Sequence, residues 1–454
     1  MTQHPLPVAK REAFHVWLRV AALSFGGPAS QIAVMHRILV DEKKWISEER
    51  FLHALNYCML LPGPEAQQLA TYIGWLMHRT AGGLMAGLLF IAPGFVAIMG
   101  LSMIYAGFGN QAWVAALFFG IKAAILAVVV EAVVRIGKRA LKNTAMVVLA
   151  GVAFVAIFMF HVPFPIIIIT AAVFGMAANR LLPALIPRPA LKHGSESATA
   201  PIDRAIAAGQ LPHIIPNTGR TIRVTAVWLA IWLVPVAACV LWLGPEHVFA
   251  KLALFFSQAA VVTFGGAYAV LAYVAQEAVN VYGWVSPGEM LDGLALAETT
   301  PGPLIMVLQF VGYLASYRAD IGLSPVVAGV VGSVLTVWVT FAPSFLWIFA
   351  GAPYVESLLG HRGLHAALSC ITAAVVGVIL NLSVWFAIHV IFAVVAETTF
   401  GPIHLSVPEW ASVNIAALII AAGSMMAILR FHVGIGPVLT FAAALGFVWK
   451  FAIG

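Results

Sequence analysis

Long apolar blocks recur along the chain and are separated by short polar or charged segments. In the first half these blocks lie near residues 13–35, 51–77, 83–106, 112–135, 144–160 and 164–182. A helix needs about 20 apolar residues to cross a bilayer, so each block predicts one membrane span. The predicted fold class is therefore an all-α polytopic membrane protein.

The second half of the chain repeats the pattern of the first. The sequence Ser-Phe-Gly-Gly at 24–27 returns as Thr-Phe-Gly-Gly at 263–266, and Pro-Gly-Pro at 62–64 returns at 301–303. Both pairs are 239 positions apart, and Ala-Pro-Gly-Phe at 92–95 returns as Ala-Pro-Ser-Phe at 342–345, 250 positions later. Several matches in the same order indicate that the two halves descend from one unit.

The repeat divides the chain into four segments. We predict an N-terminal membrane repeat at 1–182, a cytoplasmic Pro-rich linker at 183–223, one connecting span at 224–243 and a C-terminal membrane repeat at 244–454. With about six spans in each repeat, the protein has about 13 spans.

The distribution of charge predicts that the two repeats are inverted in the membrane. Lys and Arg concentrate in the short cytoplasmic loops of membrane proteins. The loop at 135–142 has four basic residues, whereas the corresponding loop of the second repeat carries only Glu397 and Glu409. A loop that changes sides should lose its basic residues, although the mixed-charge segment 37–50 falls on the outer side. Inverted repeats with broken helices are typical of secondary transporters.

Composition removes several other function classes. Apolar residues make up 62% of the chain and charged residues 9%, against about 25% charged in soluble domains, which excludes a soluble enzyme. The net charge of +6 is spread over loops and does not indicate nucleic-acid binding. Because HExxH, GxSxG and GxxxxGK[ST] motifs are absent from the sequence, we expect neither an enzyme nor a cofactor or metal site.

The two Pro-Gly-Pro motifs are the strongest candidates for a substrate site. Proline ends a helix and lets a new one start, and the N-terminus of the new helix offers free N–H groups and a positive dipole end to an anion. The alternative is an ordinary proline kink. The candidates are Pro62, Gly63, Pro64, Pro301, Gly302 and Pro303.

The Phe-Gly-Gly motifs and nearby glutamines complete this candidate site. Glycine lets a backbone approach a ligand, or merely another helix, and amide side chains can orient an oxyanion. These candidates are Gly26, Gly27, Pro28, Gln31, Gln68, Gly265, Gly266 and Gln309.

Ionisable residues inside apolar blocks are further candidates because they are costly in a membrane. Lys122 is either a substrate or coupling group, or a structural partner of Glu131 or Glu65. Glu65 and Glu298 flank the two Pro-Gly-Pro motifs and either couple transport to protons or cap restarted helices. Arg19 faces either the site or the membrane interface.

At these residues the chain resembles the chromate ion transporter family, in its long two-repeat form. The resemblance rests on Phe-Gly-Gly-Pro at 25–28 and Leu-Pro-Gly-Pro at 61–64, and on Phe-Gly-Gly-Ala-Tyr at 264–268 and Thr-Pro-Gly-Pro at 300–303. It implies export of chromate across the bacterial inner (plasma) membrane, which confers chromate resistance, with sulfate as a competitor. Ala267 stands where the first repeat has Pro28, which fits two functionally unequal halves.

Physical chemistry limits how such export is driven. Chromate is a dianion, so its exit gains about 4 to 5 kcal/mol at 100 mV, negative inside. Export runs on membrane potential, on proton antiport or on both. The alternatives are a sulfate or other oxyanion importer or exchanger on the same scaffold, and more distantly a membrane-embedded enzyme or assembly subunit. The oligomeric state is left open, a homodimer included.

Overall fold

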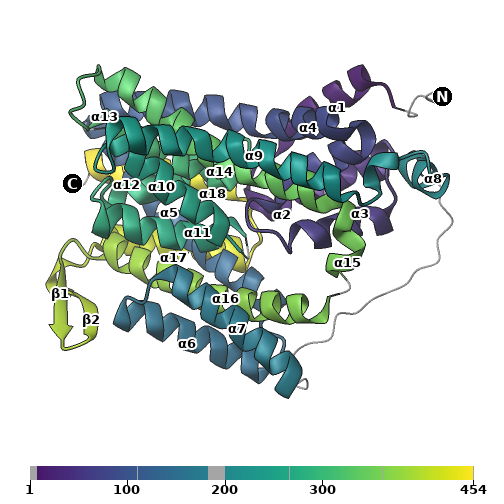
Figure 1. The fold of residues 1–454 in the computed structure, drawn as a ribbon. Helices are drawn as coiled ribbons and strands as arrows, with labels where there is room; N and C mark the ends of the chain where they lie inside the picture. The colour runs from purple at the N-terminus through teal and green to yellow at the C-terminus, as the bar shows by residue number, and fades with distance from the viewer. Residues whose placement is uncertain (1–7, 110, 183–199, 265, 360, 453–454) are drawn as a thin grey trace. The chain divides into compact units, whose positions relative to one another are not determined.

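The computed structural model describes residues 8–109, 111–182, 200–264, 266–359 and 361–452, and most of them are helical (Figure 1). The chain forms two compact units. The first comprises Met1–Met99, Arg188–Ala267 and Thr300–His365, and the second comprises Gly100–Pro187, Tyr268–Thr299 and Ala366–Gly454. Each unit contains segments of both predicted repeats, so the compact units cut across the division at 1–182 and 244–454.

The N-terminal part of the first unit is a series of interrupted helices. These are α1 (Lys10–Leu23), α2 (Gly27–His36), the π-helical η1 (Arg37–Glu42), α3 (Glu48–Cys58) and α4 (Glu65–Phe108), the last of which continues into the second unit. The span predicted at 13–35 is not one continuous helix, because Gly26 and Gly27 have φ of 75° and 78° and separate α1 from α2.

Two predicted breaks are confirmed. The apolar stretch at 51–77 is interrupted at Pro-Gly-Pro, between α3 and α4. Within α4 the chain turns at His78 and Arg79, where Arg79 has φ of 55°, so its two arms correspond to separate predicted blocks.

The rest of the first unit comes from the linker and the second half. The linker contributes α8 (Pro201–Ala207) and η3 (Pro212–Ile214), and the predicted connecting span is α9 (Thr218–Ala238) with η4 (Cys239–Leu243). The remaining elements are α10 (Val248–Val262), η6 (Leu304–Met306), α13 (Val307–Tyr317), α14 (Pro325–Gly351), η7 (Ala352–Tyr354) and α15 (Val355–Leu359). Helix α14 packs against α9, α10 and α13.

Helix α5 (Ala112–Ala140) is the centre of the second unit, where α12 (Pro287–Thr299), α17 (Ile415–Leu429) and α18 (Ile435–Ala452) pack against it. The backbones of α5 and α18 nearly touch, since a Cβ on Gly120 would lie 1.8 Å from the carbonyl oxygen of Ala442. Small residues permit such contacts between membrane helices. The other helices are α6 (Thr144–Phe160), α7 (Phe164–Leu181), α11 (Ala267–Gln276), η5 (Glu277–Val281), α16 (Arg362–Ile391) and η8 (Trp410–Ser412).

The prediction of an all-α fold is wrong at one place in the second unit. Strands β1 (Val395–Phe400) and β2 (Ile403–Pro408) form an antiparallel hairpin, visible in Figure 1. Its residues include Val, Thr, Phe and Ile, which favour strands, and Gly401 takes φ of 61° at the turn. The predicted acidic loop with Glu397 is this hairpin.

Seven helices in the described part of the chain are long and apolar enough to cross a membrane. Four shorter apolar helices are Thr144–Phe160, Val248–Val262, Leu304–Tyr317 and Ile415–Leu429. The chain is therefore a helical, multi-pass membrane protein. The arrangement of 13 spans stays a prediction, because the glycine and proline breaks leave several pieces shorter than a bilayer is thick.

Candidate functional site

The Phe-Gly-Gly motif of each half contacts the Pro-Gly-Pro motif of the other half, inside the first unit. The backbone N–H of Gly63 donates to the carbonyl of Thr263 at 2.8 Å, and the N–H of Gly302 donates to the carbonyl of Ser24 at 2.8 Å. Ser24 and Thr263 are the C-terminal caps of α1 and α10, and both are fully buried. Each Pro-Gly-Pro turn therefore satisfies an otherwise unpaired carbonyl at a helix end.

Local chemistry explains why these residues form the two contacts. The hydroxyls of Ser24 and Thr263 donate to carbonyls four residues earlier in their own helices, at 2.7 and 2.5 Å. Their own backbone carbonyls are available to the glycines because α1 and α10 end at these residues. Gly63, Gly302 and Gly266 have φ of 122°, 106° and 96°. Only glycine adopts such conformations at little cost.

The two Pro-Gly-Pro glycines also pack against equivalent motifs. A Cβ on Gly302 would lie 2.9 Å from Cα of Gly94, the third residue of Ala-Pro-Gly-Phe. A Cβ on Gly63 would lie 2.7 Å from Oγ of Ser344, the third residue of Ala-Pro-Ser-Phe, and 2.7 Å from Nε2 of Gln68. One contact is thus backbone on backbone, whereas the other brings two polar side chains to the glycine.

Ser344 is a polar residue of this region that sequence reasoning missed. Its side chain is 1% exposed, and its hydroxyl has no hydrogen-bond partner among the residues that the structure describes. The comparison of 92–95 with 342–345 contained the signal, because Ser344 is the hydroxyl-bearing difference between the two copies.

The predicted glutamines hold the loops in place. Nε2 of Gln31 donates to the carbonyl of Gly302 at 2.7 Å, Nε2 of Gln68 to that of Pro62 at 2.7 Å, and Nε2 of Gln309 to that of Phe95 at 3.0 Å. All three side chains are buried. The side-chain amides of these glutamines therefore donate to backbone carbonyls, whereas the sequence analysis expected them to donate to an oxyanion.

The other predicted residues of the first unit surround these contacts. Gly27 and Pro28 begin α2, and Glu65 begins α4. The carboxylate oxygens of Glu65 lie 3.5 and 3.6 Å from where a Cβ on Gly266 would stand, so Glu65 lies beside the second Phe-Gly-Gly motif. Gly265 lies outside the described residues.

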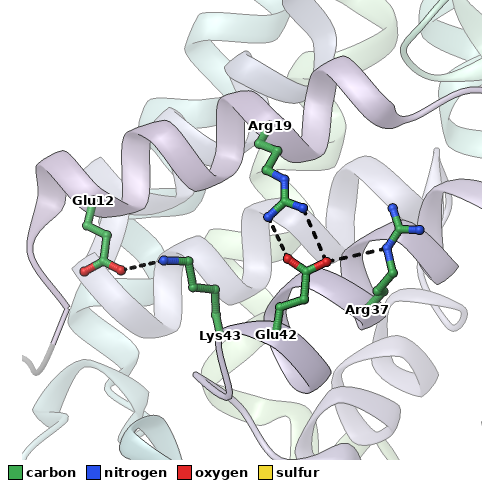
Figure 2. A network of polar contacts seen from close by, with 5 residues as sticks. All are labelled: Glu12, Arg19, Arg37, Glu42 and Lys43. Carbon is green, nitrogen blue, oxygen red and sulfur yellow. Dashed lines mark hydrogen bonds and ion pairs between the residues drawn. The ribbon is translucent and has the colours of Figure 1, made fainter.

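Arg19 belongs to a different set of contacts. Figure 2 shows Arg19 and Arg37 on either side of Glu42, and Lys43 reaching Glu12. The Arg19 guanidinium is 2.6 Å from the Glu42 carboxylate, and the Arg19 side chain is 50% exposed. These contacts favour the interface alternative over a role at the site.

Lys122 and Glu298 lie in the second unit. Nζ of Lys122 is 3.1 Å from Oδ2 of Asp292, a partner that the sequence analysis did not consider. Glu131 instead pairs with Arg135 at 3.5 Å, one turn along α5. Asp292 was missed, although an acidic residue in the apolar block that ends at the second Pro-Gly-Pro motif is a signal in itself.

Glu298 has a separate environment on α12. It is 3% exposed and accepts a hydrogen bond from the hydroxyl of Tyr268. The predicted site residues thus divide into one set around the crossed motifs of the first unit and a smaller ionisable set in the second unit.

Comparison with known proteins follows the two halves of the chain. A family model described as "Chromate transporter" matches residues 11–176 and 250–448. The chain is 32% identical over 429 residues to a chromate transport protein of Pseudomonas aeruginosa, covering 92% of both chains. It is 26% identical over 373 residues to a chromate transport protein of Cupriavidus metallidurans, covering 81% of this chain and 80% of the relative.

A shorter relative matches only part of the chain. The uncharacterized transporter YwrB of Bacillus subtilis is 29% identical over 143 residues, which are 32% of this chain and 71% of the relative. No solved structure matches the chain.

Proposed function

Because the chain belongs to the chromate transporter family, we propose that it is a secondary transporter that exports chromate across the bacterial inner membrane and so confers chromate resistance. The family match and the helical, multi-pass architecture support transport. The proposed direction, export, rests on energetics. Exit of a dianion follows the membrane potential and gains about 4 to 5 kcal/mol at 100 mV.

We further propose that the carrier consists of two inverted repeats with about 13 spans. The family model matches once in each half, and the crossed hydrogen bonds join equivalent residues of the two halves. The change from a basic loop at 135–142 to the acidic hairpin supports the inversion. Inverted repeats provide two alternative packings that open a site to opposite sides of a membrane.

The observation that carries the proposed substrate site is the reciprocal pair of hydrogen bonds between Phe-Gly-Gly and Pro-Gly-Pro motifs. It brings two helix breaks into one unit, and the N-terminus of α4 starts there with its dipole positive. The unpartnered Ser344 hydroxyl adds a side-chain donor. We assign to this site Gly26, Gly27, Pro28, Gln31, Pro62, Gly63, Pro64, Gln68, Gly266, Pro301, Gly302, Pro303, Gln309 and Ser344.

This site suits a tetrahedral oxyanion for a physical reason. Backbone N–H groups and a hydroxyl can replace the hydration shell of a dianion by hydrogen bonds, without a fully charged cation at the site. Sulfate has the same shape and charge, so we expect it to compete with chromate. Lys122 remains a candidate substrate or coupling group of the second unit.

Flux of labelled chromate into proteoliposomes tests the proposal. We would reconstitute the purified protein, impose a potential that is positive inside, and measure initial rates with and without excess sulfate. The proposal expects saturable uptake that depends on the potential and falls with sulfate. An absence of chromate flux in folded protein contradicts it, and saturable flux in pure liposomes excludes an enzyme or assembly subunit that does not transport.

A matched pair of variants tests the site. Ser344→Ala removes the unpartnered hydroxyl, whereas Thr340→Val removes a hydroxyl one turn earlier in α14 that donates to the carbonyl of Thr336 at 2.7 Å. We expect Ser344→Ala to raise the half-saturating chromate concentration about tenfold, the effect of about 1.4 kcal/mol from one lost donor to a charged group. Equal effects of the two variants would place the substrate elsewhere.

The alternative importer of sulfate makes a different prediction. Uptake of a dianion against a negative interior requires co-transported protons. Sulfate uptake that is faster than chromate efflux, and that needs an inward proton gradient, would favour this alternative.

A further inference from the structure

A partly buried cluster in the second unit joins Asp292, Lys122 and Tyr105. Nζ of Lys122 on α5 lies 3.1 Å from Oδ2 of Asp292 on α12, and the hydroxyl of Tyr105 on α4 donates to the same oxygen at 2.7 Å. The Asp292 side chain is 2% exposed, whereas that of Lys122 is 30% exposed. The cluster therefore contains a carboxylate withdrawn from solvent and a cation that reaches it from a more open position.

Glycine at position 288 makes room for the lysine. A Cβ on Gly288 would lie 3.1 Å from Nζ of Lys122, and Gly288 precedes Asp292 by one helical turn, so both lie on one face of α12. The ammonium group thus lies over a gap in the helix surface beside the carboxylate.

The two oxygens of Asp292 have unequal surroundings. Oδ2 receives both donors, whereas Oδ1 is buried and has no hydrogen-bond partner among the described residues. An ionised carboxylate in a membrane protein is costly unless a cation compensates it. Lys122 compensates the ionised form, and a proton on Oδ1 would neutralise the carboxyl group without it.

We propose that Asp292 is the proton-coupling residue of this transporter and that Lys122 is the built-in cation that takes the place of the proton. A proton from water binds Oδ1 of Asp292, the attraction to Lys122 falls, and the charge of the cluster rises from zero to plus one. Release of the proton restores the ion pair. The proposal rests on the proposed transport of chromate.

The groups that face Asp292 fit this role. They are Lys122 on α5, Tyr105 on α4 and Glu289 on α12 itself. Glu289 accepts a hydrogen bond from the backbone N–H of Ser286 at the start of α12. Asp292 has a cation at ion-pair distance, whereas the described hydrogen bond to Glu298 comes from a tyrosine.

Two fluxes in proteoliposomes test the proposal. Exchange of labelled chromate for unlabelled chromate needs no net proton movement, whereas net flux driven by a pH gradient at zero potential does. A pH-sensitive dye inside the vesicles reports the proton movement that accompanies the net flux. The wild type is expected to show all three signals.

Asp292→Asn is expected to keep exchange within about twofold of the wild type. It is expected to lower the pH-driven flux and the proton signal at least tenfold. Glu131→Gln, which alters another carboxylate paired with a basic residue in the same unit, should behave as the wild type. Retention of the pH-driven flux and the proton signal by Asp292→Asn would overturn the proposal.

The double variant Asp292→Asn with Lys122→Gln separates coupling from structure. Removing both charges avoids the unpaired lysine that the single change leaves, so the double variant should fold even where Asp292→Asn does not. If the ion pair is merely structural, the ratio of pH-driven flux to exchange in the double variant should equal that of the wild type, which would overturn the proposal. If Asp292 couples transport to protons, that ratio should fall at least tenfold, whatever Lys122→Gln does to exchange itself.

The wild type distinguishes this inference from the proposed function. Chromate exchange without any pH-driven flux would overturn the coupling role of Asp292 and leave chromate transport standing. An absence of all chromate exchange would overturn both.

Discussion

Replacing Gly302 by alanine tests the close backbone contact at the second Pro-Gly-Pro motif. The φ of Gly302 is 106°, and a Cβ there would lie 2.9 Å from Cα and 3.1 Å from N of Gly94. An alanine in this conformation costs about 1–2 kcal/mol. Overpacking adds about 1–3 kcal/mol, since the neighbouring atoms are backbone and cannot rotate away. We therefore expect Gly302→Ala to destabilise the protein by about 2–5 kcal/mol.

Gly322→Ala is the matched control. Gly322 lies in the same unit with φ of 74°, and no described atom lies within 4 Å of where its Cβ would stand. This variant therefore carries only the backbone cost of about 1–2 kcal/mol. The difference between the two variants isolates the contact with Gly94.

Thermal unfolding of the two purified variants in detergent, followed by tryptophan fluorescence, measures the difference. Gly302→Ala should unfold at a clearly lower temperature than Gly322→Ala and should also lose chromate exchange in proteoliposomes. If both variants unfold at the same temperature, Gly302 does not lie against Gly94 as described, and the packing of the second Pro-Gly-Pro motif is refuted.

Three further variants test other contacts. Gln31→Leu leaves the carbonyl of Gly302 without its donor, so the free energy of unfolding should fall by about 1–3 kcal/mol and the unfolding temperature should fall with it. An unchanged unfolding temperature would contradict this hydrogen bond. Burial lowers the pKa of His213 in the linker from 6.5 to about 4, although its hydrogen bond to the carbonyl of Trp75 opposes the shift. The packed linker holds His213 neutral. The contribution of this packing to stability is therefore complete above pH 6.5 and is lost as the pH falls toward 4. Proteolysis of the linker should thus accelerate between pH 7 and pH 5, and His213→Gln should flatten that dependence. Arg19→Ala breaks an exposed ion pair worth about 0–1 kcal/mol and should leave chromate flux unchanged, so a tenfold loss would return Arg19 to the transport site.

The sequence by itself determined the class of the protein and the places where its helices break. Apolar blocks of membrane length, the missing N–H of proline and the conformational freedom of glycine are local properties. They predicted the break between α3 and α4 and the turn at His78 and Arg79. Apolar content alone did not predict two features. It missed the interruption of 13–35 at the glycine pair, and it missed the β1–β2 hairpin, which strand propensity favours.

The tertiary structure decided which of these local features meet. Residues 200 positions or more apart carry no local signal of contact, so only the folded chain pairs Gly63 with Thr263 and Gly302 with Ser24. It likewise gives Lys122 the partner Asp292, which no helical spacing could indicate. Long-range pairing depends on which surfaces bury each other's polar groups, and that is settled by packing rather than by any single segment.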